Sequence, residues 1–250
     1  MSVVRVSSAV VLVIVASAVM SPGAPAAEAP RRVALLVGVE HYHKPGFRDL
    51  RFCEDDVIAV GQELTKLGFE VTVLLGSAEG DQQATKANIE RVARQIVAPL
   101  GKQDIALVML SGHGQQLDRA PDSPTPPQGF DFDSSDSYFC PVDARLNDPR
   151  SQVSLSYLLD DVLALDVGRK MLLVDACRDV PADPSARGKN AKGIEGRQIR
   201  LREGTAVYFS CSAGQQSFEK DELGHGLFTH CVLEALRGEA ASAAGEISWS

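Results

Sequence analysis

Five short apolar runs, spread along the chain and separated by helical patterns, constrain the fold more than any other feature of the sequence. The first, at 32–39, reads RVALLVGV and shows no alternation of apolar and polar residues. A continuous run of this kind is typical of a strand that is buried on both faces. The same pattern predicts further strands at 69–75, 104–110, 170–174 and 205–210, and a shorter one is predicted at 138–142.

Amphipathic helices are predicted between these strands. Apolar residues recur at helical spacing in four segments: Val57 to Leu67, closed by Gly68; Ile89 to Ile96; 155–165, capped by Ser154; and 227–236. Strands that alternate with helices favour an α/β fold, with a mostly parallel central sheet and helices on both faces. Ligands of such sheets bind beyond the carboxyl ends of the strands, so the residues that follow each strand are the first candidates for a site.

A histidine and a cysteine follow two of the predicted strands. His113 lies in SGHGQQ, after the third run, and Cys177 lies in DACRD, after the fourth. A thiol becomes a strong nucleophile near neutral pH when a base lies beside it. Gly112 and Gly114 are predicted to let the backbone turn sharply at His113, and the N–H groups of Gly114 and Cys177 are predicted to form an oxyanion hole. The alternatives are a small buried cysteine and a histidine with a purely structural role.

The motifs SGHG and DACRD resemble those of the caspase-like cysteine peptidases, in particular the bacterial metacaspase and orthocaspase branch. Asp175 and Asp179 stand where animal caspases have Gln and Gly, so the chain departs from the animal pattern. The resemblance continues in ALLVGVEHY, LRFCEDDV, GFDFDSSDSYFCPVDA, YFSCSAGQQSF and GHGLFTHCVLEALRG. It implies a three-layer caspase-like sandwich at 31–240, in which Cys177 attacks a peptide carbonyl and His113 protonates the leaving amine. It also implies a dyad without an acidic third member.

The resemblance further implies a preference for Arg or Lys at P1, the residue before the scissile bond. In metacaspase-like enzymes the positions that match Asp56, Ser111 and Asp175 shape an acidic pocket. A carboxylate in a partly desolvated slot prefers a cation. Three alternatives stay open: Asp56 complements a helix dipole, Asp175 caps the backbone at a strand end, or Asp55 takes the place of Asp56.

The loop at 183–203 is predicted to be a linker that the enzyme cuts itself. Its segment 185–200 is glycine-rich and carries four basic residues, Arg187, Lys189, Lys192 and Arg197. A protease that cuts after Arg or Lys would find substrate sites there. The alternative is a solvated surface loop.

The first 27 residues have the pattern of a secretory signal peptide. Arg5 precedes an apolar run at 10–20, and Ala24-Pro25-Ala26 resembles a cleavage site. We therefore expect an exported protein, periplasmic or extracellular, that meets a membrane only through this leader if it is uncleaved. In an exported protein an odd number of cysteines, here five, leaves at least one thiol outside any intramolecular disulfide.

No cofactor is expected from the sequence. The cysteines and histidines lack the spacing of a zinc site, and the sequence has no EF-hand loop that would support calcium dependence. Asp131, Asp133 and Asp136 are predicted to lie in a solvated acidic loop, and residues 41–43, HYH, are interpreted as a loop at the substrate edge.

These observations favour a cysteine endopeptidase that acts on polypeptides. The net charge of −8 argues against a nucleic-acid partner. The main alternative is a catalytically inactive caspase-like module that binds other proteins. An unrelated α/β hydrolase or nucleotide binder is disfavoured, because the sequence has no Gly-x-Ser-x-Gly elbow, P-loop or Gly-x-Gly-x-x-Gly. Residues 241–250 are expected to begin a further segment.

Overall fold

The structure is a computed structural model that describes residues 29–118, 135–163, 167–177, 203–210, 219–220 and 224–239. The five apolar runs form a parallel sheet in the order β2-β1-β3-β6-β7. Its strands are β1 Arg32–Gly38, β2 Glu70–Leu75, β3 Ile105–Asp118, β6 Arg169–Cys177 and β7 Thr205–Phe209. The predicted parallel sheet is therefore confirmed.

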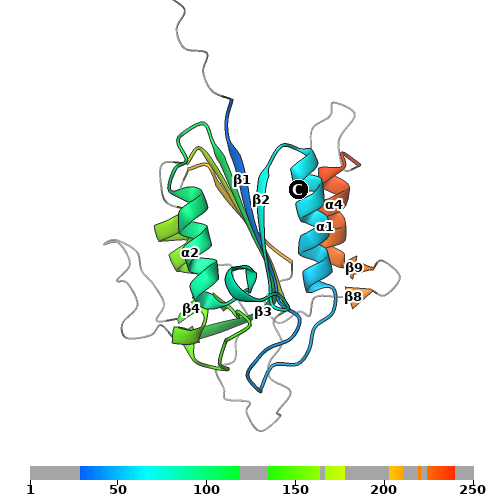
Figure 1. Ribbon diagram of the computed structural model, residues 1–250, viewed down its shortest axis with the longest axis vertical. Coiled ribbons are helices and arrows are strands. Elements are labelled where there is room, and N and C mark those ends of the chain that lie inside the picture. Colours follow the sequence, from blue (N-terminus) through cyan, green and yellow to red (C-terminus); the bar gives the residue numbers. More distant parts are fainter. Residues whose placement is uncertain are drawn as a thin grey trace, which may run out of the picture.

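Helices cover both faces of this sheet (Figure 1). Helices α1 Cys53–Lys66 and α4 Leu227–Leu236 lie on one face; α2 Lys86–Val97, with the short helix α3 Leu155–Tyr157 and the π-helical turn η3 Leu158–Val162, lies on the other. Alternate residues of β1 enter the two cores. Val33 and Leu35 pack with α2 and η3, whereas Ala34 and Leu36 pack with α1 and α4. This arrangement confirms the three-layer sandwich.

Strand β3 is much longer than its apolar run. It continues beyond Leu110 to Asp118, and its last five residues pair antiparallel with β4 Ser135–Phe139. Strand β4 in turn pairs with β5 Val153–Ser154. The strand predicted at 104–110 is therefore only the first part of β3. An apolar run marks only the part of a strand that helices cover on both sides, whereas backbone pairing continues wherever a partner strand is available.

The buried Asp136 of β4 forms hydrogen bonds with serines at the end of β5 and the start of α3. Ser154 caps the helix as predicted, because its hydroxyl accepts a hydrogen bond of 3.0 Å from the N–H of Tyr157. The hydroxyls of Ser154 and Ser156 donate to the carboxylate of Asp136 at 2.5 and 2.7 Å. Asp136 is buried, so the prediction of a solvated acid is wrong for this residue. Asp131 and Asp133 lie outside the described residues.

Several shorter elements complete the described chain. Strands β8 Glu219–Lys220 and β9 His225–Gly226 form a small antiparallel sheet directly before α4, which the sequence did not predict. The 3₁₀ turns are η1 Gly80–Gln82 and η2 Pro149–Ser151. None of the helices in the described ranges is long and apolar enough to cross a lipid bilayer. The predicted leader 1–27, nearly all of the linker 183–203 and the segment 241–250 lie outside these ranges.

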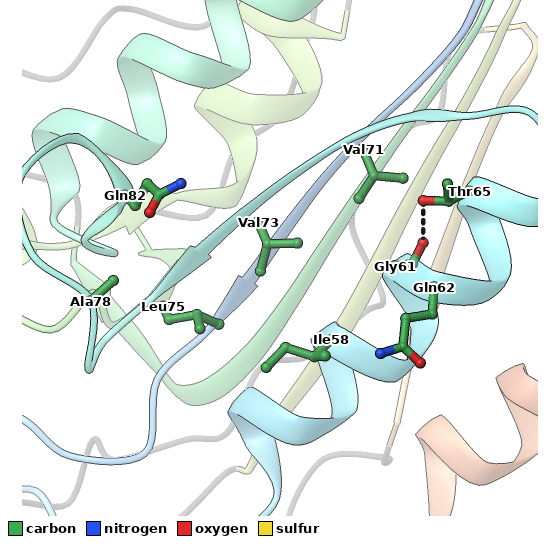
Figure 2. Close-up of a pocket in the computed structure, with 9 residues that line it drawn as sticks. All are labelled: Ile58, Gly61, Gln62, Thr65, Val71, Val73, Leu75, Ala78 and Gln82. Atoms are coloured by element: carbon green, nitrogen blue, oxygen red, sulfur yellow. Dashed lines mark hydrogen bonds between the residues drawn. The ribbon is translucent and has the colours of Figure 1, made fainter.

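An open groove lies between α1 and the edge strand β2 (Figure 2). Its walls come from alternate residues of β2 and from one side of α1, where the Thr65 hydroxyl donates to the Gly61 carbonyl at 2.8 Å. None of the predicted site residues lines this groove, whose lining residues are Ile58, Gly61, Gln62, Thr65, Val71, Val73, Leu75, Ala78 and Gln82.

Candidate active site

The register between β3 and β6 brings the two predicted catalytic residues together. His113 and Cys177 are directly paired Cα partners, at the carboxyl ends of the parallel part of the sheet. Two residues earlier, Ser111 and Asp175 are paired in the same way. All four residues belong to the strands themselves, so the prediction that His113 and Cys177 follow their strands was wrong by a few residues.

The His113 ring is held in one tautomer by the backbone of the loop that follows β1. Its Nε2 lies 2.9 Å from the carbonyl oxygen of Arg48. Because a carbonyl only accepts hydrogen bonds, Nε2 must carry a proton, which leaves Nδ1 as the basic nitrogen of the neutral ring. Only 4% of the residue is exposed, and this burial lowers the pKa of His113. The lowered pKa favours the neutral form of the ring near neutral pH.

Aromatic residues of the same loop enclose His113. The ring centroids of Tyr42 and Phe47 lie 5.2 and 5.7 Å from that of the histidine. The Tyr42 hydroxyl also accepts a hydrogen bond of 2.8 Å from the backbone N–H of His113. The loop therefore fixes the ring through Arg48 and the backbone through Tyr42.

Gly112 has a different role from the one predicted. The backbone does not turn at Gly112 or Gly114, because both lie within β3. A Cβ atom at Gly112 would instead come within 3.0 Å of the Tyr42 hydroxyl and 3.1 Å of the Phe139 ring. Glycine at this position thus makes room for the aromatic side chains that pack around His113.

The HYH segment in this loop was interpreted as a substrate-edge loop rather than a metal site. His41 forms an exposed ion pair of 3.0 Å with Asp49, and the hydrogen bond that its ring donates to this carboxylate raises the pKa of His41. Between the two histidines, Tyr42 contacts His113. Within the part of the chain that the structure describes, no group of three or more His, Cys, Asp and Glu side chains is arranged to hold a metal ion.

Two buried carboxylates, Asp56 and Asp175, lie close together beside β3 and β6. Asp56 comes from the first turn of α1 and Asp175 from β6, and only 2% and 6% of them are exposed. A Cβ atom at Gly226 would lie 3.0 Å from Oδ2 of Asp56 and 3.3 Å from Oδ2 of Asp175. The two oxygens therefore border the same small space. The neighbouring Asp55 is exposed, so Asp56 is the acid of this pair that joins Asp175.

Asp56 is held by two consecutive residues that precede α4. Its Oδ1 lies 2.7 Å from Nδ1 of His225, and its Oδ2 accepts a hydrogen bond of 3.2 Å from the N–H of Gly226. Burial, with a further contribution from the charge of Asp175, raises the pKa of Asp56 to about 6, although His225, Thr229 and Gly226 act in the opposite direction. Asp56 is therefore largely ionised at neutral pH but sits close to its titration range.

No pattern in the sequence identified these partners of Asp56. His225 and Gly226 lie in GHGLFTH. This segment contributes to the family resemblance, but it did not predict a role for either residue. Arg48 was missed for a different reason. It contributes a main-chain carbonyl to His113, and no side-chain motif identifies that group.

The predicted oxyanion-hole residues lie at the same end of the sheet. Gly114 follows His113 in β3 and pairs with Phe139 of β4, and Cys177 is the last residue of β6. Of the other cysteines in the described ranges, Cys53 and Cys140 are buried and Cys231 is exposed on α4, and the backbone N–H of Cys140 donates to the His113 carbonyl at 2.9 Å. Complete burial raises the pKa of the Cys140 thiol.

A family model and solved structures both match the chain. A family model described as the caspase domain, of the C14 peptidases, matches residues 31–247, which is most of the chain. A crystal structure of a protein from Geobacter sulfurreducens aligns with a TM-score of 0.44 and 26% identity, over 59% of this chain and 51% of that one. The chain thus spans about half the length of that protein. None of the curated proteins gives a significant match.

Proposed function

The chain belongs to the caspase-domain family of cysteine peptidases, and on that premise we propose that it is an endopeptidase that cleaves polypeptides after Arg or Lys. In this proposal Cys177 is the nucleophile and His113 is the general base and acid. The observation that carries it is the pairing of His113 with Cys177 across β3 and β6. Neighbouring parallel strands leave only a short span between a base and a nucleophile at paired positions.

The proposed reaction has two steps. Nδ1 of His113 takes the thiol proton, and the Cys177 sulfur attacks the peptide carbonyl to form a tetrahedral intermediate. The N–H groups of Gly114 and Cys177 are the proposed donors to its oxyanion. As the C–N bond breaks, His113 gives its proton to the leaving amine, and a thioester remains. Water, deprotonated by His113, then hydrolyses the thioester, which releases the acid product and restores the thiol.

The hydrogen bond to Arg48 supports this role for His113. The Arg48 carbonyl engages Nε2 and keeps a proton there, so that Nδ1 exchanges protons during the cycle. It also stabilises the imidazolium that forms when the thiol is deprotonated. This hydrogen bond supports the proposed dyad, in which the Arg48 carbonyl takes the place of an acidic third member.

The basic specificity is proposed from Asp56 and Asp175. Two buried carboxylates repel each other, and a guanidinium or ammonium group between their Oδ2 atoms would relieve that repulsion. An acidic P1 side chain would add a third negative charge to the same space. Ser111, buried beside Asp175 in the strand register, is the proposed neutral member of this pocket.

A peptide assay tests the function directly. The substrates are matched peptides with Arg, Lys or Asp at P1, and the expected result is cleavage after Arg and Lys only. Replacement Cys177→Ala or His113→Ala should lower kcat/KM by at least about 10³-fold. Replacement Asp175→Asn should raise KM for Arg peptides at least about tenfold, whereas the exposed Asp55→Asn is a matched control that should leave it unchanged. Equal hydrolysis by the wild type and Cys177→Ala would refute the peptidase assignment, and cleavage after Asp alone would refute only the pocket.

Self-processing at 185–200 is a separate part of the proposal. The four basic residues of that segment match the proposed P1 preference. Purified wild-type protein should become cut there over time, while Cys177→Ala protein stays intact until a small amount of active enzyme is added. Full activity of a protein that stays uncut would show that cleavage is not needed for activation.

A further inference from the structure

We propose that His225 is a positioning residue that determines the basic specificity, because it holds one oxygen of the Asp56 carboxylate and so presents the other, beside Asp175, to the substrate cation. This inference rests on the proposed function, since it concerns the same pocket. It adds to that pocket a residue from β9 that has no part in the proposed chemical steps.

The geometry that carries the inference is a fork of two donors from adjacent residues. Nδ1 of His225 engages Oδ1 of Asp56 at 2.7 Å, and the N–H of Gly226 engages Oδ2 at 3.2 Å. Together the two contacts fix the plane of the carboxylate and not only its position. One contact is from a side chain and one from the backbone, so the orientation of Asp56 is sensitive to the identity of residue 225.

The orientation matters because of where the second oxygen lies. Oδ2 of Asp56 and Oδ2 of Asp175 both border the space over Gly226, which has no side chain to fill it. A guanidinium is a planar fork of N–H donors and is suited to bridging two such oxygens. If the Asp56 carboxylate rotated out of this plane, its oxygen would no longer border the space shared with Asp175, and the bridge would be lost.

His225 also keeps Asp56 ionised. The other side-chain groups that act on Asp56 are the carboxylate of Asp175 from β6 and the hydroxyl of Thr229 from α4. Glu219 and Lys220 of β8 pair with β9 through the backbone. Burial and the charge of Asp175 both favour a protonated, neutral Asp56. The hydrogen bond from Nδ1 of His225 lowers the pKa of Asp56 and so opposes these two effects. Without it, Asp56 would hold a proton more readily and attract a cation less.

The test compares two donors at position 225. Replacement His225→Asn keeps an N–H at the place of Nδ1, whereas His225→Gln moves the donor to the place of Nε2, and His225→Ala removes it. His230→Ala is the matched control, since His230 lies on the surface of α4 and pairs only with Glu234, at 3.4 Å, among the contacts of the described residues. Each variant is assayed on paired peptides with Arg or citrulline at P1, because citrulline has nearly the shape of Arg without its charge.

The expected result is a loss of charge discrimination and not of chemistry. His225→Ala and His225→Gln should lower the preference for Arg over citrulline at least about tenfold, through KM and with little change in kcat. His225→Asn should retain most of the preference, and His230→Ala should retain all of it. A purely structural role would lower cleavage of both peptides together. An unchanged preference in both His225→Ala and His225→Gln would overturn the inference and leave the proposed function standing.

A binding measurement separates the inference from catalysis. Benzamidine, a small mimic of the Arg side chain, is titrated calorimetrically into the Cys177→Ala protein with and without His225→Gln. The expected result is a dissociation constant at least about tenfold higher when His225 is replaced. Equal binding would overturn the inference. If the wild type neither binds benzamidine nor cleaves Arg peptides, both proposals are overturned. If it binds benzamidine but cleaves no peptide, only the peptidase assignment is overturned.

Discussion

His113 and Cys177 are paired Cα partners on neighbouring parallel strands, and the carbonyl of Arg48 accepts a hydrogen bond from Nε2 of the histidine. This relationship gives the histidine a defined basic nitrogen next to the strand that ends in the cysteine. Activity of such a pair depends on the protonation states of both residues. It can therefore be examined through thiol chemistry as well as through peptide cleavage.

Alkylation should distinguish the cysteines of the native protein. Cys231 is exposed and should react with iodoacetamide, whereas Cys140 and Cys53 are buried and should react only on unfolding. Because His113 is proposed to take the thiol proton of Cys177, Cys177 should react faster than Cys231, and His113→Ala should slow Cys177 alone. Peptide mass mapping over time gives each rate. Equal slowing of Cys177 and Cys231 in the variant would instead indicate a general change of the fold.

Replacement Tyr42→Phe should destabilise the protein. The variant removes the hydroxyl that accepts from the backbone N–H of His113, so a buried donor loses that partner at a cost of about 1–3 kcal/mol. Urea unfolding measures the change, and kcat should fall as His113 becomes less well fixed. Tyr157→Phe is the control, because the Tyr157 hydroxyl accepts from Arg94 in an exposed bond whose loss should cost little. Similar destabilisation by both variants would argue against a special role for the Tyr42 bond.

Replacement Gly226→Ala should block the acidic pocket without unfolding the protein. The backbone of Gly226, with φ of −60° and ψ of 144°, suits any residue, but the new methyl group would lie 3.0 and 3.3 Å from the two carboxylate oxygens. We expect KM for Arg peptides to rise at least about tenfold. Gly101→Ala is the matched control, since the nearest atom to its methyl group is 3.9 Å away. An unchanged KM in Gly226→Ala would show that the substrate does not enter this space.

The stability of the protein should depend on the ionisation of Asp56. Its pKa is raised from 3.8 to about 6 in the folded protein, so between these pH values the unfolded chain releases a proton that the folded protein keeps. This carboxyl group therefore stabilises the fold fully below about pH 4, and its contribution, up to roughly 3 kcal/mol, is lost as the pH rises through 6.

The comparison of Asp56→Asn with the wild type isolates this contribution. Urea unfolding from pH 4 to pH 8 should show the stability of Asp56→Asn rising relative to the wild type as the pH increases. The exposed Asp55→Asn should follow the wild-type curve. A constant difference between Asp56→Asn and the wild type across this range would mean that Asp56 does not titrate there.

Much of the fold follows from local patterns in the sequence. Apolar runs predicted the five parallel strands, and helical periodicity predicted α4 with its exact bounds and α1 and α2 to within a few residues. The same patterns placed His113 and Cys177 at one edge, because parallel strands bring their carboxyl ends together. The apolar pattern failed where a strand continues its backbone pairing beyond its apolar residues, as β3 does up to Asp118.

The sequence by itself thus determined the layers, the direction of the strands and the edge at which the site lies, since these depend on periodicities that extend over only a few residues. The tertiary structure alone decided which groups meet there. The exact pairing of His113 with Cys177, the carbonyl of Arg48 and the contact of Asp56 with His225 join positions 64 or more residues apart. No local pattern encodes such contacts, because they exist only once the packing of helices on the sheet has fixed the distance between distant segments.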